Sequence, residues 1–85
     1  MSRRVIVVGD AIDHGGEVVS GSPSDAIDGR AIAREGDEVR CRRHGRTHIA
    51  EGCTTARIDG RAIALEGHRT ACGARLIGSS GARIE

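Results

Sequence analysis

Short apolar runs alternate with glycine-rich polar segments along the whole chain. Residues 5–8 are apolar throughout, which predicts a first strand covered on both faces, and residues 9–16 predict a loop. Further short strands are predicted at residues 17–20, 47–51 and 74–77. Alanine-rich pieces such as residues 61–65 have helical propensity, but glycines bound them closely, and an isolated helix that short is marginal. The pattern therefore predicts a fold that is mostly β.

One stretch of seven residues, Ile-Asp-Gly-Arg-Ala-Ile-Ala, occurs twice, at residues 27–33 and again 31 positions later at residues 58–64. In both copies an Asp-Gly pair lies between apolar residues, which is a strong short-range signal for a β-hairpin. Each copy follows a segment led by a glycine, Gly21 or Gly52, and a third such segment begins at Gly78. This periodicity predicts three imperfect β-hairpin repeats with pseudo-threefold symmetry.

Residues that can bind metal ions occur in register with the repeats. The fifth residue after a repeated glycine is, in turn, His14, Cys41 and Cys72, and the extra residues of the middle repeat contain a fourth candidate, His44. Two cysteines and two histidines are the composition of a closed structural zinc site. Thiolate and imidazole ligands together suit zinc better than calcium or magnesium. We therefore predict one zinc ion per chain, bound by these four residues.

The sequence leaves alternatives open for several of these residue types. The cysteines could instead be small buried residues and the histidines solvated loop residues. His68 occupies the place of Asp10 and Asp37 in the other repeats and is the best substitute metal ligand, whereas the pattern around His48 indicates an ordinary surface residue. Cys53 occupies the place of Ser22 and Ser79, which indicates a buried replacement for serine.

Composition explains why a metal would be needed. The chain has 85 residues and no phenylalanine, tyrosine or tryptophan, so the largest contributors to an apolar core are missing. A domain this small buries only about 60–65% of its unfolded surface and usually needs a disulfide or a metal ion for stability. Three cysteines is an odd count, which favours thiolate ligands over a framework of disulfides.

Charge and hydropathy exclude several classes of partner. The net charge of +1 gives no global field for nucleic acid or membrane surfaces. Four arginines cluster near the predicted metal ligands, but without an aromatic residue to stack on a base we expect them to form a solvated rim. The apolar run at residues 5–8 is too short for a signal peptide, and no later run reaches transmembrane length. We expect synthesis in the cytoplasm.

Several motifs in combination resemble those of the PAAR-repeat (Pro-Ala-Ala-Arg) family. They are Asp13-His14-Gly15-Gly16, Gly21-Ser22-Pro23, the doubled Asp-Gly-Arg-x-x-Ala, Cys41-x-x-His44-Gly45 and Cys72-Gly73-Ala74. The Pro-Ala-Ala-Arg segment itself is degenerate, since residues 31–34 read Ala-Ile-Ala-Arg and residues 62–65 read Ala-Ile-Ala-Leu. Asp28 and Asp59 also stand where the family often has asparagine. Ligand composition varies in the family, and sets of three histidines and one cysteine are known.

The resemblance implies a small zinc-bearing cone of β-hairpins without enzymatic activity. Such a cone caps the trimeric β-helical spike (the valine-glycine repeat protein) of a type VI secretion system, helps it to puncture membranes, and travels out with it and its effectors. We expect a single domain over residues 1–85 without an effector extension, monomeric alone and binding one per spike trimer. Because the end of a β-helix is apolar and exposes unpaired backbone groups, we assign the spike interface to the glycine-led segments: Ala26, Ile27, Ala56, Ile58, Ala82 and Ile84.

Two other classes of function fit parts of the sequence. A zinc enzyme needs an open coordination position, which four protein ligands would not leave. A small zinc module that binds nucleic acid or another protein is the alternative to the spike tip, and a strong dependence of DNA binding on salt would support it.

Overall fold

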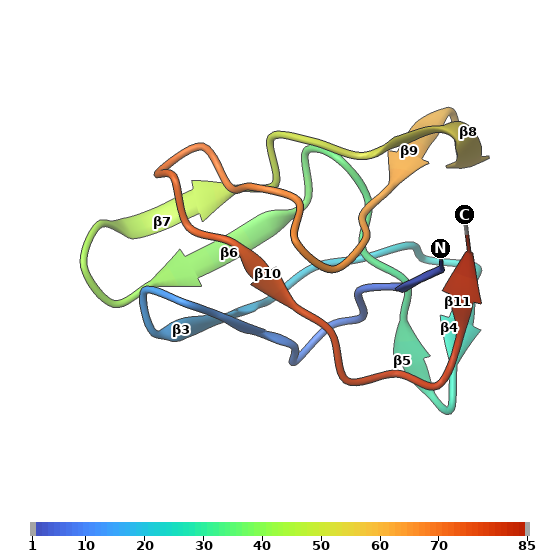
Figure 1. The fold of residues 1–85 in the computed structure, drawn as a ribbon, viewed down its shortest axis with the longest axis horizontal. Coiled ribbons are helices and arrows are strands. Elements are labelled where there is room, and N and C mark those ends of the chain that lie inside the picture. The colour runs from blue at the N-terminus through green and yellow to red at the C-terminus, as the bar shows by residue number, and fades with distance from the viewer. Residues whose placement is uncertain (1, 85) are drawn as a thin grey trace.

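Eleven short strands joined by turns make up residues 2–84, which are the residues described by a computed structural model of the chain (Figure 1). The strands are β1 (Arg3–Arg4), β2 (Ala11–Ile12), β3 (Gly16–Val18), β4 (Ala26–Ile27), β5 (Arg30–Ala31), β6 (Glu38–Cys41), β7 (Gly45–His48), β8 (Cys53–Ile58), β9 (Arg61–Ile63), β10 (Leu76–Ile77) and β11 (Arg83–Ile84). The prediction of a mostly β fold is confirmed. Met1 and Glu85, the ends of the predicted domain, lie outside the described residues. None of the described residues belongs to a helix that could cross a membrane.

The strands form one larger sheet and three small ones. The five-stranded sheet is antiparallel and has the order β10-β2-β3-β6-β7, while β1-β11, β4-β5 and β8-β9 are two-stranded. Figure 1 shows the three small sheets together at one end of the longest axis, beside both termini. The turns of the larger sheet, between β2 and β3 and between β6 and β7, lie at the other end. The molecule thus has two structurally different ends.

Both predicted Asp-Gly hairpins are confirmed. Ile27 pairs with Arg30, and Ile58 pairs with Arg61, so each hairpin closes with a two-residue turn. Asp28 has a φ of 51° and Gly29 a φ of 81°, and the turn at residues 59–60 repeats these positive values. A two-residue turn with positive φ at both positions matches the right-handed twist of the strands it joins, which is why Asp-Gly is favoured there.

Three segments of the chain bond to one another in a closed ring at the centre of the fold. Ala33 N donates to Ile6 O at 2.8 Å, Ala64 N donates to Ala33 O at 3.0 Å, and Ile6 N donates to Ala64 O at 3.0 Å. The isolated bridges that flank this ring follow the same cyclic order: Val7 with Ile32, Arg34 with Ile63, and Val5 with Leu65. The two copies of the repeated stretch and the first apolar run therefore make equivalent backbone contacts.

This ring corrects the prediction of one continuous strand at residues 5–8. Val5, Ile6 and Val7 are buried, as the apolar run indicates, but the segment changes partner halfway along its length. Ile6 bonds to the stretch after β9, whereas Val8 N donates to Ala31 O in β5. A second correction concerns residues 9–16, where β2 occupies the middle of the predicted loop because Ala11 pairs with Glu17 and Ile77.

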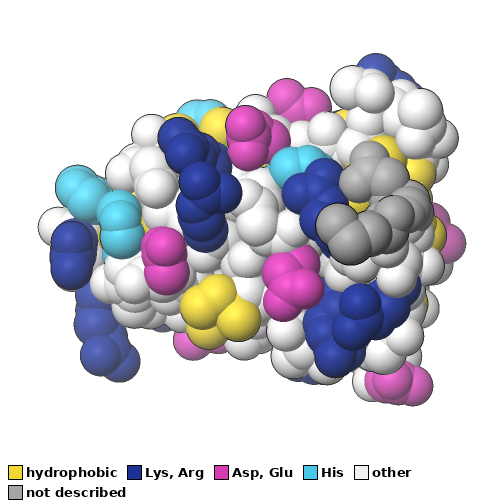
Figure 2. All heavy atoms as spheres, in the orientation of Figure 1, with side chains coloured by type: hydrophobic (Ala, Val, Ile, Leu, Met, Phe, Trp, Pro, Cys, Tyr) yellow, Lys and Arg dark blue, Asp and Glu magenta, His cyan; other side chains and the backbone are white. Residues whose placement is uncertain are grey.

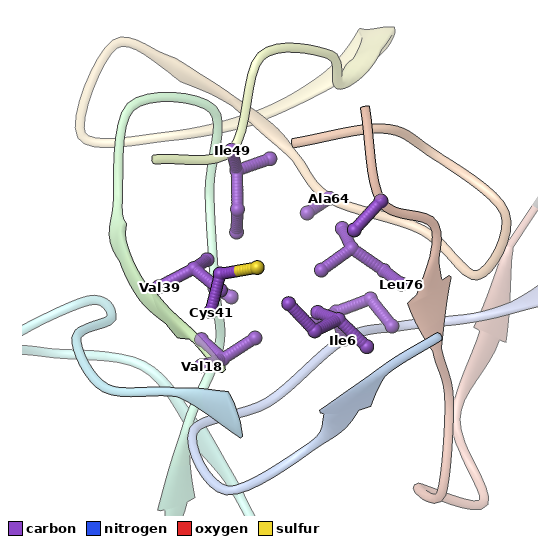
Figure 3. Close-up of a cluster of buried hydrophobic side chains, with 10 residues drawn as sticks. Ile6, Val18, Val39, Cys41, Ile49, Ala64 and Leu76 are labelled. Atoms are coloured by element: carbon purple, nitrogen blue, oxygen red, sulfur yellow. The ribbon is translucent and has the colours of Figure 1, made fainter. Parts of the chain in front are cut away.

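The apolar interior is divided into two clusters. The larger contains ten buried residues, and Figure 3 shows its labelled side chains converging from several segments: Ile6, Val18, Val39, Cys41, Ile49, Ala64 and Leu76. The smaller lies under the two-stranded sheets and has Val5, Cys53 and Leu65 at its centre. Aliphatic residues and cysteines fill both clusters, because the chain has no phenylalanine, tyrosine or tryptophan to fill a wider interior.

Candidate metal centre

The four predicted ligands come from three turns of the chain. His14 lies in the turn between β2 and β3, Cys41 is the last residue of β6, and His44 lies in the turn that follows it. Cys72 lies in the turn that precedes β10. The structure brings one potential ligand atom of each residue within 4.8 Å of all the others. They form the only such group of three or more His, Cys, Asp or Glu side chains found among residues 2–84.

The separations within this cluster approach those of a tetrahedral zinc site, since one lies inside the expected range, one at its upper limit and one slightly above it. Cys41 Sγ lies 3.4 Å from His44 Nδ1 and 3.8 Å from His14 Nδ1, and Cys72 Sγ lies 4.0 Å from His14 Nδ1. Ligands of a tetrahedral zinc ion with sulfur and nitrogen bonds of ordinary length are about 3.3–3.8 Å apart. The imidazole rings of His14 and His44 are tilted by 43°, with their centroids 5.5 Å apart. Two thiolates and two imidazoles would complete the coordination of the ion.

Hydrogen bonds donated by the backbone hold the three turns together. Arg42 N donates to Gly15 O at 2.9 Å, joining the turns that carry Cys41 and His14. Arg75 N donates to Asp13 Oδ1 at 2.9 Å, and Ala71 N donates to His48 O at 2.8 Å. Because protein contacts already connect each turn to a neighbour, the ligand atoms are positioned by the fold as well as by any ion they bind.

Gly16 is needed for the approach of His14 to Cys41. It pairs directly with Cys41 across β3 and β6, and its φ is 120°. A Cβ atom at this position would lie 1.9 Å from the carbonyl oxygen of Arg40. Only glycine allows the two strands to come this close, and the turn that contains His14 follows from that pairing.

Burial differs among the four ligands. Cys41 is 2% exposed and belongs to the larger apolar cluster, whereas His44 lies at the surface. Burial raises the pKa of the Cys72 thiol, but hydrogen bonds with Thr70, the backbone of Ala74, Cys41 and Thr47 together lower it further, so the pKa is lower than usual. A lower pKa favours the thiolate, which is the form that binds zinc.

Thr70 is the residue of this centre that the sequence pattern did not reveal. Its hydroxyl oxygen lies 3.1 Å from Cys72 Sγ and accepts a hydrogen bond of 3.1 Å from Ala74 N. The hydroxyl therefore orients the third turn and contacts the thiol at the same time. Its spacing in Thr-x-Cys is the only signal in the sequence, and that pattern is too common to identify it.

His68, the substitute ligand that the sequence left open, lies outside the metal cluster and has a backbone role. Its Nδ1 accepts a hydrogen bond of 3.0 Å from Leu65 N. In the other repeats the carboxylates of Asp10 and Asp37 accept the equivalent bonds, from Val7 N at 2.9 Å and from Arg34 N at 2.7 Å. In each repeat this side chain stabilises the tight turn that leads into the next segment.

The other candidates lie apart from the metal cluster. His48 is exposed at the end of β7, as its pattern indicates. Cys53 is 5% exposed, like Ser22, and lies in the smaller apolar cluster. Ser79 differs from both, since it is exposed and its hydroxyl donates to the buried carboxylate of Asp10.

The six residues assigned to a spike interface lie on strands of the two-stranded sheets or directly beside them. Four are partly buried against the smaller apolar cluster: Ile27, Ala56, Ala82 and Ile84. Ile58 is half-buried at the end of β8, and Ala26 is exposed in β4. These strands lie at the end of the molecule opposite the turns that carry His14 and His44 (Figure 1).

A small domain whose described residues form strands and turns, and whose turns bring two cysteines and two histidines together, has the features of a structural module with a candidate metal site. The model of one family, described as PAAR motif, matches residues 8–78, and the chain belongs to this family. The PAAR motif family is associated with the tips of type VI secretion spikes and is a structural module. No curated protein matches the sequence.

Proposed function

We propose that this protein is the zinc-stabilised tip of a type VI secretion spike. It caps the trimeric valine-glycine repeat protein, sharpens its end, and so helps the spike to puncture membranes and deliver effectors. The observation that carries the proposal is the closed ring of hydrogen bonds among Ile6, Ala33 and Ala64. Three segments of one chain that repeat one set of contacts support a pseudo-threefold arrangement, which a cap for a trimer requires.

The same character argues for one tip per trimer. Each spike chain would contact one of the three two-stranded sheets, so a single copy of this protein satisfies all three. Self-association into a trimer would repeat a symmetry that the monomer already has. We therefore propose a monomer in isolation.

The base of the proposed cone is the end with the two-stranded sheets. Short strands there offer backbone groups to the last turn of a β-helix, and the partly buried apolar residues around Val5 and Leu65 offer an apolar contact. About 800 Å² of buried surface on the tip would be an ordinary specific interface. The spike-contacting residues are then those assigned from the sequence: Ala26, Ile27, Ala56, Ile58, Ala82 and Ile84.

Zinc would brace the opposite end. The cluster of His14, Cys41, His44 and Cys72 joins three turns at the edge of the larger apolar cluster, to which Cys41 belongs. With four protein ligands the ion is structural, since no position remains for a water molecule or a substrate. A rigid point supported by an ion rather than by a large core suits a domain without aromatic residues.

Capture by an immobilised spike trimer tests both the function and the orientation. We expect the zinc-loaded protein to bind, Ile58→Glu and Ile84→Glu to abolish binding while zinc content stays at one per chain, and Arg42→Glu to bind normally. Light scattering should show one copy per trimer and a monomer in isolation. Loss of binding in Arg42→Glu but not in Ile84→Glu would reverse the orientation, and a stable homotrimer would contradict the capping model.

A further inference from the structure

Two of the three turns at the metal end are flanked by arginines that lie directly opposite each other. Arg40 pairs with Arg46 across β6 and β7, and Arg69 forms a bridge with Arg75 across the turn that contains Cys72. All four residues are exposed. Like charges in directly opposed positions destabilise an antiparallel pair. An arrangement that costs stability, and that occurs beside two different turns, points to a ligand that needs this charge density.

Nearby carboxylates neutralise the pairs only in part. Arg46 forms an exposed ion pair of 3.2 Å with Glu38, and Arg40 lies opposite Glu17 on its other side. Glu51 accepts a hydrogen bond from the backbone of Arg69 rather than from its guanidinium. Of these four arginines, only Arg46 takes part in an ion pair resolved within residues 2–84, so the other three guanidinium groups are not held by a carboxylate.

The turn between β6 and β7 adds two further arginines. Arg42 and Arg43 are both exposed, and the ion pairs resolved within residues 2–84 involve neither of them. Figure 2 shows arginine side chains beside histidines at this end of the molecule. A zinc ion held by two thiolates would add no net charge. We call these six residues the arginine rim: Arg40, Arg42, Arg43, Arg46, Arg69 and Arg75.

The chemistry of the rim selects phosphate as its ligand. Guanidinium groups bind phosphate oxygens through pairs of parallel hydrogen bonds, and they lose less hydration than ammonium groups when they do so. The chain has no aromatic residue on which a nucleic-acid base could stack. The turn between β6 and β7, which carries Arg42 and Arg43, lies at the end away from the two-stranded sheets, so it faces outward when those sheets contact a spike (Figure 1).

We propose that the arginine rim binds the phosphate headgroups of an anionic lipid bilayer. The choice of a membrane rests on the proposed function, because the outward end of a spike tip is the first part of the assembly to meet one. Binding at the rim would hold the metal-braced end against the surface before the spike advances. The binding itself is electrostatic and needs no insertion of apolar residues.

Co-sedimentation of the zinc-loaded chain with lipid vesicles tests the inference. We expect binding to vesicles of phosphatidylcholine and phosphatidylglycerol in equal parts, little binding to pure phosphatidylcholine, and weakening with added salt. The double variant Arg42→Gln/Arg43→Gln should bind about thirtyfold more weakly, since each basic residue near an anionic surface contributes about 1 kcal/mol. The matched control is Arg57→Gln/Arg83→Gln, which removes the same charge from exposed residues of β8 and β11 and should bind like the parent.

The outcomes separate this inference from the proposed function. Equal binding to both kinds of vesicle, equal loss in the two double variants, or tighter binding to duplex DNA than to anionic vesicles would overturn it. Zinc content measured on every variant shows whether the fold is retained. Spike capture by the Arg42→Gln/Arg43→Gln variant should be normal. Failure of vesicle binding with intact spike capture would remove the membrane role alone, whereas failure of spike capture by the parent protein would remove the proposed function.

Discussion

Arg34 forms an ion pair of 3.1 Å with Asp59, which lies in the turn of the hairpin formed by β8 and β9. The guanidinium is buried and also contacts Asp37 at 3.0 Å, so it joins two repeats. In the cyclic arrangement of backbone bonds, Arg34 occupies the place that Val7 and Leu65 occupy in the other segments. A charged residue has therefore replaced an apolar one where the carboxylates of two different turns converge.

Replacing Arg34 with valine should destabilise the fold by about 2 kcal/mol, since hydrogen bonds to charged groups contribute roughly 1.5–3 kcal/mol. The loss stays below that of an isolated buried charge, because Asp37 keeps contacts with Ser20 and Arg61. In the equivalent place of the first segment, Val7 lies beside the buried Asp10, so the fold already accommodates valine next to a buried aspartate. Urea unfolding of the zinc-saturated protein measures the change. Asp59→Asn is the control and should lower the free energy of unfolding by less than about 1 kcal/mol, since the Asp59 side chain is 43% exposed. Equal losses of stability in the two variants would contradict this account.

The metal centre predicts different outcomes for two cysteines that are both buried. Cys41→Ser should leave the protein without stoichiometric metal and unfolded or insoluble, because structural zinc contributes on the order of 10 kcal/mol to folding. Cys53→Ser should keep one zinc per chain, since this residue lies in the other apolar cluster and Ser22 is buried in the corresponding place. Elemental analysis of the purified proteins and thermal unfolding check both. Normal zinc content and melting in Cys41→Ser would exclude the assigned ligand set.

Two glycines with positive φ should respond very differently to substitution by alanine. Gly16→Ala places a Cβ against the carbonyl oxygen of Arg40, so β3 and β6 must separate and the turn carrying His14 must move. We expect a loss of at least about 3 kcal/mol and weaker zinc retention. Gly29→Ala meets no atom within 4 Å, so only the backbone strain of about 1–2 kcal/mol remains. Thermal unfolding and competition with a chelator distinguish the two, and similar effects would contradict the close approach at Gly16.

Removal of the Thr70 hydroxyl should make zinc binding more sensitive to acid. Burial raises the pKa of Cys72 and the hydrogen bond from Thr70 is the largest influence that lowers it. Thr70→Val should therefore raise this pKa, so that protons compete with zinc at a higher pH and release begins earlier as the pH falls. Zinc release followed with a chromogenic chelator across a pH series measures the midpoint. Thr70→Ser keeps the hydroxyl and should behave like the parent, and an unchanged or lower midpoint in Thr70→Val would refute the role of this bond.

The hairpins and the clustering of the two cysteines and two histidines could be predicted from the sequence because their signals are local or periodic. An Asp-Gly pair between apolar residues specifies its own turn, since positive φ at two successive positions is a property of those residues alone. The common offset after Gly9, Gly36 and Gly67 identified side chains that the structure brings within 4.8 Å of one another. A repeat places equivalent residues in equivalent positions whatever surrounds them.

Contacts between the repeats were decided only by the tertiary structure. Residues 5–8 contain the same apolar pattern whether they pair with one neighbour or with two, and only the closed ring through Ile6 shows that they change partner. The sequence aligns His68 with two aspartates but does not reveal that its imidazole accepts a backbone hydrogen bond. Arg34 and Asp59 are 25 residues apart and belong to different turns, so nothing local links them. Local backbone preferences depend on neighbouring residues. The partner of a strand or of a buried charge depends instead on which distant segments the folded chain brings beside it.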